Sequence, residues 1–276
     1  MSRGPRAVVL TWHSNNVLGH GYAENDHVAL AEDLRLLAAE GCTVCPLGAV
    51  IDALFEGRGE LPERCVALSF DDGSWFDWHA LPHPTLGVQP GFRQVLQQAP
   101  LPVQATAFVI VSPEARAELD RTCLIGQGWW GEAWWPEATA EGLITVENHS
   151  WDHNHDSLSA RVAADRPGGT FANIDSHALA DAQIRQAADY LDARRGVPGS
   201  RLFAYPYGQC SDYLAREYFP RHRAEHRQAA ALTTEPQPLT PDEDRWQLGR
   251  YVCGQHWRSP DGLRQILRDA FGGAGH

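Results

Sequence analysis

The sequence predicts a parallel α/β barrel on three observations. Short apolar runs alternate with longer amphipathic stretches, which is the pattern of parallel strands joined by covering helices. The apolar runs number about seven, which suits a barrel better than a small open sheet. Neither an internal repeat nor a low-complexity linker divides the 276 residues. We therefore expect a single domain over 1–276, because α/β barrels of about 250 residues commonly form one domain.

In the first half of the chain, three apolar runs are expected to form strands, at 7–12, 65–70 and 103–111. Leucines spaced three or four residues apart predict a helix over 27–40, which Gly41 ends. A shorter helix is expected over 92–98, because prolines bound it on both sides.

In the second half, strands are expected at 143–147, 201–204 and 229–233. A long helix is predicted over 176–195, with Gly196 as its stop signal. The last helix, over 260–271, places its leucines and isoleucine on one face. The stretches 14–26, 73–90 and 233–245 read as long surface loops, and such loops in a compact domain are often functional.

Composition limits the possible partners. Asp and Glu outnumber Lys and Arg by 35 to 23, giving a formal charge of −12, which disfavours nucleic acid as a general partner. Six cysteines without repeated spacing do not make a disulfide framework, and Cys42 and Cys45 are expected to be ordinary buried thiols. The first apolar run is too short for a signal peptide, and no run reaches the ~20 residues of a membrane span. We therefore expect a soluble, cytoplasmic protein without a membrane partner; its oligomeric state stays open.

Polar residues follow the predicted strands at the edge where parallel strands present ligand sites. His13 follows the first strand, and Asp71 and Asp72 follow the second. His149 and His153 follow the strand over 143–147, and Tyr207 follows the one over 201–204. Because these ends meet on one rim, we expect acids, imidazoles and aromatic rings to converge there.

Two of these groups have a specific chemical interpretation. Asp71 and Asp72 are adjacent, so one can bind a metal while the other handles protons, although Asp-Asp-Gly is also good turn chemistry. His149 and His153 are four residues apart, which places both on one face of a helical turn and lets both bind one metal. With a carboxylate they would make a two-His, one-carboxylate set. The alternative is a surface or capping pair.

Three segments in this order, Ser-Phe-Asp71-Asp72-Gly, His149-Ser-Trp-Asp-His153 and Phe-Ala-Tyr-Pro-Tyr207-Gly, resemble the first motifs of the polysaccharide deacetylases (NodB homology, carbohydrate esterase family 4). The resemblance implies a distorted (β/α)7 barrel and metal-dependent hydrolysis of an N-acetyl or related acyl group. It implies that Asp72, His149 and His153 bind a divalent metal, usually zinc. It also implies that Asp71 is the general base and that the backbone N–H of Tyr207 helps to hold the oxyanion.

The chain departs from the family pattern at two points. Ala204 stands where many members have an arginine that orients the base, and Arg250, in Leu-Gly-Arg-Tyr-Val, could supply that charge. The late Leu-x-His motif that often supplies the acid is not visible. His13 takes that role in our prediction, because Leu-Thr-Trp-His13 resembles the early strand-end histidine of bacterial poly-N-acetylglucosamine deacetylases. His256 is the alternative acid.

The sequence leaves three functions open. The first is a metal-dependent deacetylase of an N-acetylated sugar. The second is an amidohydrolase acting on a small non-sugar amide or a cyclic ureide. The third is a sugar-binding module that has lost catalysis, as the missing arginine and late histidine would allow. Four tryptophans between 129 and 135 suit a core or a lid, with sugar stacking as the alternative.

Overall fold

A curled parallel sheet forms the centre of the computed structural model, which describes residues 4–197 and 199–272. Seven strands follow one path in the order β10-β1-β3-β6-β7-β8-β9, and β2 pairs beside them with β3. Within the described ranges the sheet strands are β1 (Ala7–Trp12), β2 (Thr43–Val44), β3 (Cys65–Phe70), β6 (Ala105–Val109), β7 (Ile144–Asn148), β8 (Leu202–Ala204), β9 (Ala230–Leu232) and β10 (Tyr251–Val252). Every pair in this sheet is parallel, whereas β4 (Leu81–His83) and β5 (Gly87–Gln89) form a separate antiparallel hairpin.

The segment that ends in β10 brings the two edges of the sheet together. At one edge, Leu248 forms a parallel bridge with Leu232 in β9. At the other edge, β10 pairs with β1. The sheet thus curls into the distorted barrel that the sequence predicts, with the loop before β10 closing the gap.

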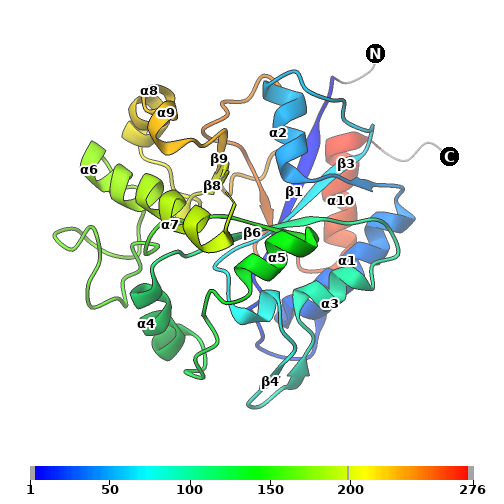
Figure 1. Cartoon of the computed structure of the whole chain (residues 1–276). Coiled ribbons are helices and arrows are strands. Elements are labelled where there is room, and N and C mark those ends of the chain that lie inside the picture. Colours follow the sequence, from blue (N-terminus) through cyan, green and yellow to red (C-terminus); the bar gives the residue numbers. More distant parts are fainter. Residues whose placement is uncertain (1–3, 198, 273–276) are drawn as a thin grey trace.

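Helices surround this sheet (Figure 1). In the first half of the chain they are α1 (Asp26–Ala39), α2 (Leu47–Phe55), α3 (Phe92–Gln97), α4 (Pro113–Cys123) and α5 (Trp135–Glu141). Of these, α2 packs on the cluster formed by the inward-facing residues of the sheet. In the second half they are α6 (His177–Ala180), α7 (Gln186–Arg195), α8 (Phe219–Arg221), α9 (Arg223–His226) and α10 (Pro260–Phe271). Two π-helical segments, η3 (Asp181–Arg185) and η5 (Leu214–Tyr218), continue α6 into α7 and lead into α8. Single-turn 3₁₀ helices occur at η1 (Tyr22–Glu24), η2 (Trp75–Asp77) and η4 (Pro206–Gly208).

The predicted elements are confirmed, with small shifts at their ends. The strands over 7–12 and 65–70 and the helix over 260–271 match residue for residue. The long helix predicted over 176–195 is continuous but contains the π-helical turn of η3. The sequence did not predict the very short strands β2 and β10, the β4–β5 hairpin within the expected loop 73–90, or helices α2, α4, α5, α8 and α9. Cys42 is buried and Cys45 half-buried, and both are free thiols.

Side chains alternate between the two faces of each strand. This alternation creates two hydrophobic cores and sets the direction of the residues at the rim. In β1, Val8 and Leu10 belong to the cluster that α1 and α10 cover, whereas Ala7 and Val9 belong to a second apolar cluster with α2, Leu232 and Leu248. Neighbouring positions of a strand point to opposite faces, so every second residue faces inward. The sheet therefore delivers the residues that follow its strands alternately to the barrel interior and to the outer layer.

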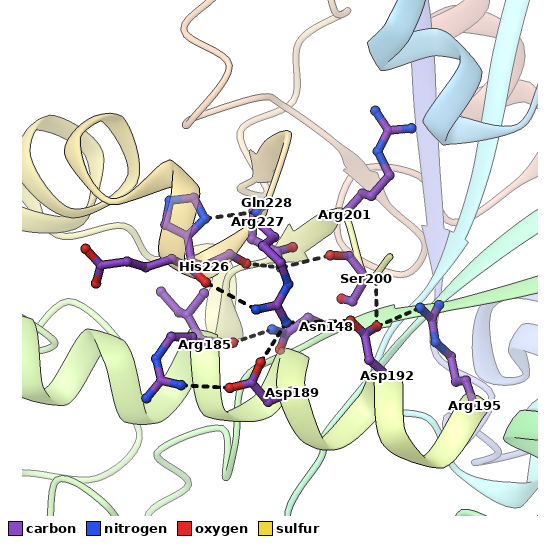
Figure 2. Close-up of polar contacts among 12 residues, drawn as sticks. Asn148, Arg185, Asp189, Asp192, Arg195, Ser200, Arg201, His226, Arg227 and Gln228 are labelled. Carbon is purple, nitrogen blue, oxygen red and sulfur yellow. Dashed lines mark hydrogen bonds and ion pairs between the residues drawn. The ribbon is translucent and has the colours of Figure 1, made fainter. Parts of the chain in front are cut away.

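A network of charged side chains ties α9 and the start of β9 to α7 (Figure 2). Asp189 of α7 accepts hydrogen bonds from Arg185 and from Arg227, each at 2.7 Å. Gln228 donates to the carbonyl oxygen of Ser200 at 3.2 Å. The Arg227–Asp189 bond fixes the end of α9 against the long helix, and the Gln228–Ser200 bond joins the segments that precede β9 and β8. In the part of the chain that the structure describes, the helices are all too short or too polar to cross a bilayer.

Candidate active site

Inward-facing positions at the carboxyl ends of β1 and β3 build the floor of the candidate site. The hydroxyls of Thr11 and Ser69 lie 2.7 Å apart inside the barrel. His13 and Asp71 lie two residues after Thr11 and Ser69. Because side chains of a strand alternate between its two faces, His13 and Asp71 lie on the same side of the sheet as Thr11 and Ser69. The alternation therefore explains why these polar residues share the rim.

Asp72 turns away from the strand direction because its backbone is left-handed. Its φ is +76° and that of Gly73 is +78°. A Cβ on Gly73 would stand 2.5 Å from Cγ1 of Val109, so this position requires glycine. The carbonyl oxygen of Asp72 accepts hydrogen bonds from the N–H of Ile110 at 3.1 Å and from the Trp130 indole at 3.0 Å. This turn separates the two adjacent carboxylates and gives them different partners.

His149 and His153 come together through a loop, and the predicted helical turn is wrong. Ser150 and His153 have φ values of +72° and +61°, which a right-handed helix excludes. The loop is held by the Asn148 side chain, which accepts the Ser150 N–H at 2.8 Å, and by the Ser150 hydroxyl, which accepts the His153 N–H at 2.9 Å. The imidazole centroids are nevertheless 4.9 Å apart.

Asp72, His149 and His153 present three ligand atoms to one point. Oδ1 of Asp72 lies 3.8 Å from Nε2 of His149 and 3.9 Å from Nε2 of His153. Nδ1 of His149 donates to the carbonyl oxygen of Ala204 at 2.8 Å, which leaves the Nε2 lone pair free to face the carboxylate. Nδ1 of His153 is buried without a hydrogen-bond partner among the described residues. Two imidazoles and one carboxylate are a donor set that fits a divalent ion such as zinc.

Burial keeps both imidazoles in the neutral form that binds metals. Desolvation lowers the pKa of His149, although Asp71 and Asp72 oppose the shift. Desolvation, followed by the neighbouring His149 and His155, lowers the pKa of His153 well below its ordinary value. Both imidazoles are therefore neutral at neutral pH and need not release a proton before binding an ion.

Asp71 forms a buried, bidentate ion pair with Arg250. Nη1 and Nη2 of Arg250 lie 2.7 and 2.9 Å from the two carboxylate oxygens. The Arg250 side chain is 0% exposed and that of Asp71 is 5% exposed. Burial would raise the pKa of Asp71, but the guanidinium of Arg250 and the imidazole of His149 outweigh it and hold that pKa below its usual range. Asp71 is thus a carboxylate at neutral pH, and its Oδ2 lies 3.9 Å from Nε2 of His149.

The position of Arg250 follows from barrel closure. It stands between Leu248, which bridges to β9, and Tyr251, which pairs with β1. Its Nε donates to the carbonyl oxygen of Thr233 at 3.0 Å. The closing segment therefore carries the guanidinium to the Asp71 carboxylate, although Ala204 stands where many family members have an arginine.

Tyr207 lies at the mouth of the site with a left-handed backbone, φ +57°. Its ring stands edge-on to His153, with centroids 4.5 Å apart. The following residue, Gly208, packs so closely on Thr234 that an added Cβ would lie 2.0 Å from its hydroxyl. The turn is thereby fixed, with Tyr207 beside the trio.

A cavity of about 220 Å³ joins these groups. It is lined by His13, Asp71, Asp72, His149, His153, Tyr207, Gly208, Thr234, Val252 and Gln255. His13 is thus at the cavity, and its backbone N–H donates to Asp26 at 2.8 Å. Nδ1 of His256 instead accepts the N–H of Val252 at 2.7 Å, which engages it in the β10 turn.

Sequence reasoning missed several residues that support the site. Asn15 donates to Asp72 Oδ2 at 3.3 Å, and Trp130 donates to the Asp72 carbonyl oxygen. Ala204 contributes the carbonyl that orients His149. The only signals in the sequence were the length of loop 14–26 and the density of tryptophans after residue 128.

The comparison with protein families decides the relationship. The model of the family described as polysaccharide deacetylase matches residues 58–219, more than half of the chain. The chain belongs to the polysaccharide deacetylase family. The matched region contains Asp71, Asp72, His149, His153 and Tyr207, whereas His13 and Arg250 lie outside it. A search of curated proteins finds no match.

Solved structures share the fold of this polysaccharide deacetylase. IcaB from Ammonifex degensii is 21% identical, with a TM-score of 0.67 over 99% of both chains. A de-N-acetylase from Aggregatibacter actinomycetemcomitans is 16% identical, with a TM-score of 0.65 over 95% of this chain and 99% of that one. The deacetylase PplD of Streptococcus pyogenes, solved in complex with acetate, is 16% identical, with a TM-score of 0.64 over 96% and 99%. These likenesses confirm the predicted (β/α)7 barrel.

Proposed function

We propose that the chain is a metal-dependent hydrolase that removes an acetyl group from an N-acetylated sugar. Family membership supports deacetylation of a carbohydrate. The observation that carries the finer proposal is the pairing of a metal-ligand trio with a separate, buried carboxylate. Asp72 faces the two imidazoles, whereas Asp71 faces Arg250 and stays ionised. The different partners of the two adjacent carboxylates thus support different tasks for them.

In this mechanism Asp72, His149 and His153 hold a divalent ion, with zinc as the first expectation. Such an ion polarises an amide carbonyl and lowers the pKa of a water molecule. Asp71 accepts the proton of the attacking water, for which it must be ionised. Arg250 keeps it so and fixes both of its oxygens. The backbone N–H of Tyr207 donates to the oxygen on which negative charge develops.

His13 protonates the leaving amine in our proposal. It lines the same cavity as Asp71, whereas His256 is not among the lining residues. A histidine imidazole in reach of the leaving amine can donate a proton to it as a general acid. The cavity itself is smaller than the ~300–1,000 Å³ of typical ligand sites, which suits an acyl group and the sugar unit that carries it.

Asp71→Asn tests the proposal. The amide cannot accept the proton, so turnover should fall by about 10²–10⁴-fold while zinc remains bound. Acetate release from N-acetylated amino sugars measures turnover, and elemental analysis measures bound metal. Full activity in the variant would remove Asp71 from its role as base. Opening of small cyclic amides by the wild-type protein, with no acetate released from any sugar, would instead favour the amidohydrolase.

A further inference from the structure

A second cluster of metal-binding side chains lies on the surface, on elements distinct from those of the deacetylase site. His177 begins α6, His222 lies between α8 and α9, and Glu225 belongs to α9. Their ligand atoms all lie within 4.8 Å of one another. We propose that His177, His222 and Glu225, called here the surface cluster, form a second zinc site that clips α6 to the α8–α9 segment.

The distances within the surface cluster match those between ligands of one ion. Nδ1 of His222 lies 3.0 Å from Oε1 of Glu225, and Nε2 of His177 lies 3.5 Å from Oε2. Two ligands about 2.0–2.1 Å from a tetrahedral zinc stand about 3.3–3.4 Å apart, between these two values. Two imidazoles and one carboxylate leave a further position for water, as in other three-ligand zinc sites.

The rings of the surface cluster are positioned before any ion arrives. Tyr218 stacks on His222 with centroids 5.6 Å apart and meets His177 edge-on at 5.7 Å. The hydroxyl of Tyr218 is buried and has no hydrogen-bond partner in the described part of the chain. His177 and His222 stand edge to face at 4.5 Å. Aromatic packing thus holds both imidazoles toward Glu225, which reduces the entropy lost on binding.

The backbones that carry the cluster are fixed as well. Arg227, directly after α9, donates to Asp189 of α7 at 2.7 Å, as Figure 2 shows. α6, which begins at His177, leads into the π-helical η3, and the π-helical η5 leads into α8, which His222 follows. Such segments are rare in proteins and are often found at functional sites.

Glu225 pairs with the two histidines, whereas the neighbouring arginines pair with other carboxylates. Arg185 is engaged by Asp181 and Asp189, and Arg223 is engaged by Glu56. The neighbouring arginines therefore already have carboxylate partners, and Glu225 is left to the histidines.

Zinc titration of the full chain tests the inference, with Zn²⁺ alone as the probe. Wild-type apo protein should bind about two ions per chain, and His177→Ala about one. His149→Ala, which removes the deacetylase site, should also bind about one, and the double variant none. Exposed His20 provides a matched control, because His20→Ala should bind as the wild type does. Glu225→Gln is a second, milder variant that should weaken only the surface ion.

The results separate this inference from the proposed function. If His177→Ala and Glu225→Gln bind as much zinc as the wild type, the surface site is refuted and the cluster is only a hydrogen-bonded group. If His149→Ala loses no ion while His177→Ala does, the proposed deacetylase centre fails and the surface site stands. A zinc-edge anomalous map of the zinc-soaked protein should show a peak between His177 and His222. Its absence would overturn the inference.

Discussion

Removing the charge of Arg250 should damage both stability and catalysis. The guanidinium makes two charge-assisted hydrogen bonds to Asp71, at 2.7 and 2.9 Å, with both side chains almost fully buried. Each such bond contributes about 1.5–3 kcal/mol, and breaking a buried pair by removing one partner costs about 3–5 kcal/mol. We expect Arg250→Met to lower the free energy of unfolding by about 3–5 kcal/mol. Arg250→Lys keeps the positive charge but not the bidentate geometry of the guanidinium, so it should lower the free energy of unfolding by less.

Arg250→Met should also shift the pH dependence of kcat/KM. Without its counter-charge the pKa of Asp71 rises, because the largest interaction that opposes the effect of burial is gone. The base must be ionised, so activity is lost as pH falls through that pKa, and the acidic limb of kcat/KM shifts to higher pH. Denaturant unfolding of the apo protein and acetate release against pH measure the two effects. Arg201→Met, which breaks a partly exposed pair with Asp52, is the control and should cost about 0–1 kcal/mol. An Arg250→Met protein within 1 kcal/mol of wild type, with an unmoved profile, would refute this account of the ion pair.

Three further predictions concern His13, Trp130 and Glu147. His13→Ala should lose about 10²–10⁴-fold in kcat with metal content unchanged, and loss of metal instead would make His13 a ligand. Trp130→Phe removes the indole donor to the Asp72 carbonyl and should weaken zinc binding by about 10-fold, whereas Trp129→Phe should not. Burial raises the pKa of Glu147 from 4.5 to about 7, so the protein should lose stability as pH rises between these values, by up to about 3 kcal/mol. Glu147→Gln should flatten that slope in unfolding measurements and Glu60→Gln should not; equal slopes in all three proteins would contradict the shift.

The rim of the site was predictable because it depends on local pattern. His13 and Asp71 each follow a buried strand, and the alternation of a strand fixes the side to which they point. The chemistry of Asp71, Asp72, His149 and His153 was likewise visible as residue types at strand ends. Their catalytic and ligand roles stay predictions.

What the sequence did not predict depends on long-range contacts. The His149–His153 loop departs from a helix because Asn148 and Ser150 bond to its backbone, which spacing alone does not reveal. Arg250 could only be suggested, since β10 is two residues long and forms through barrel closure. Helix α4, in contrast, has a local start signal, because Ser112-Pro-Glu is typical of a helix N-terminus. The Ser112 hydroxyl caps α4 by accepting the Ala115 N–H.

Zinc binding at the trio of Asp72, His149 and His153 is the most direct test of the central claim. The measurement is zinc titration of apo protein in the His177→Ala background, where the surface cluster is disabled, with and without His149→Ala. The account predicts about one tightly bound ion that His149→Ala abolishes and Asp71→Asn preserves. An ion retained unchanged in His149→Ala, or no ion in either protein, would contradict it.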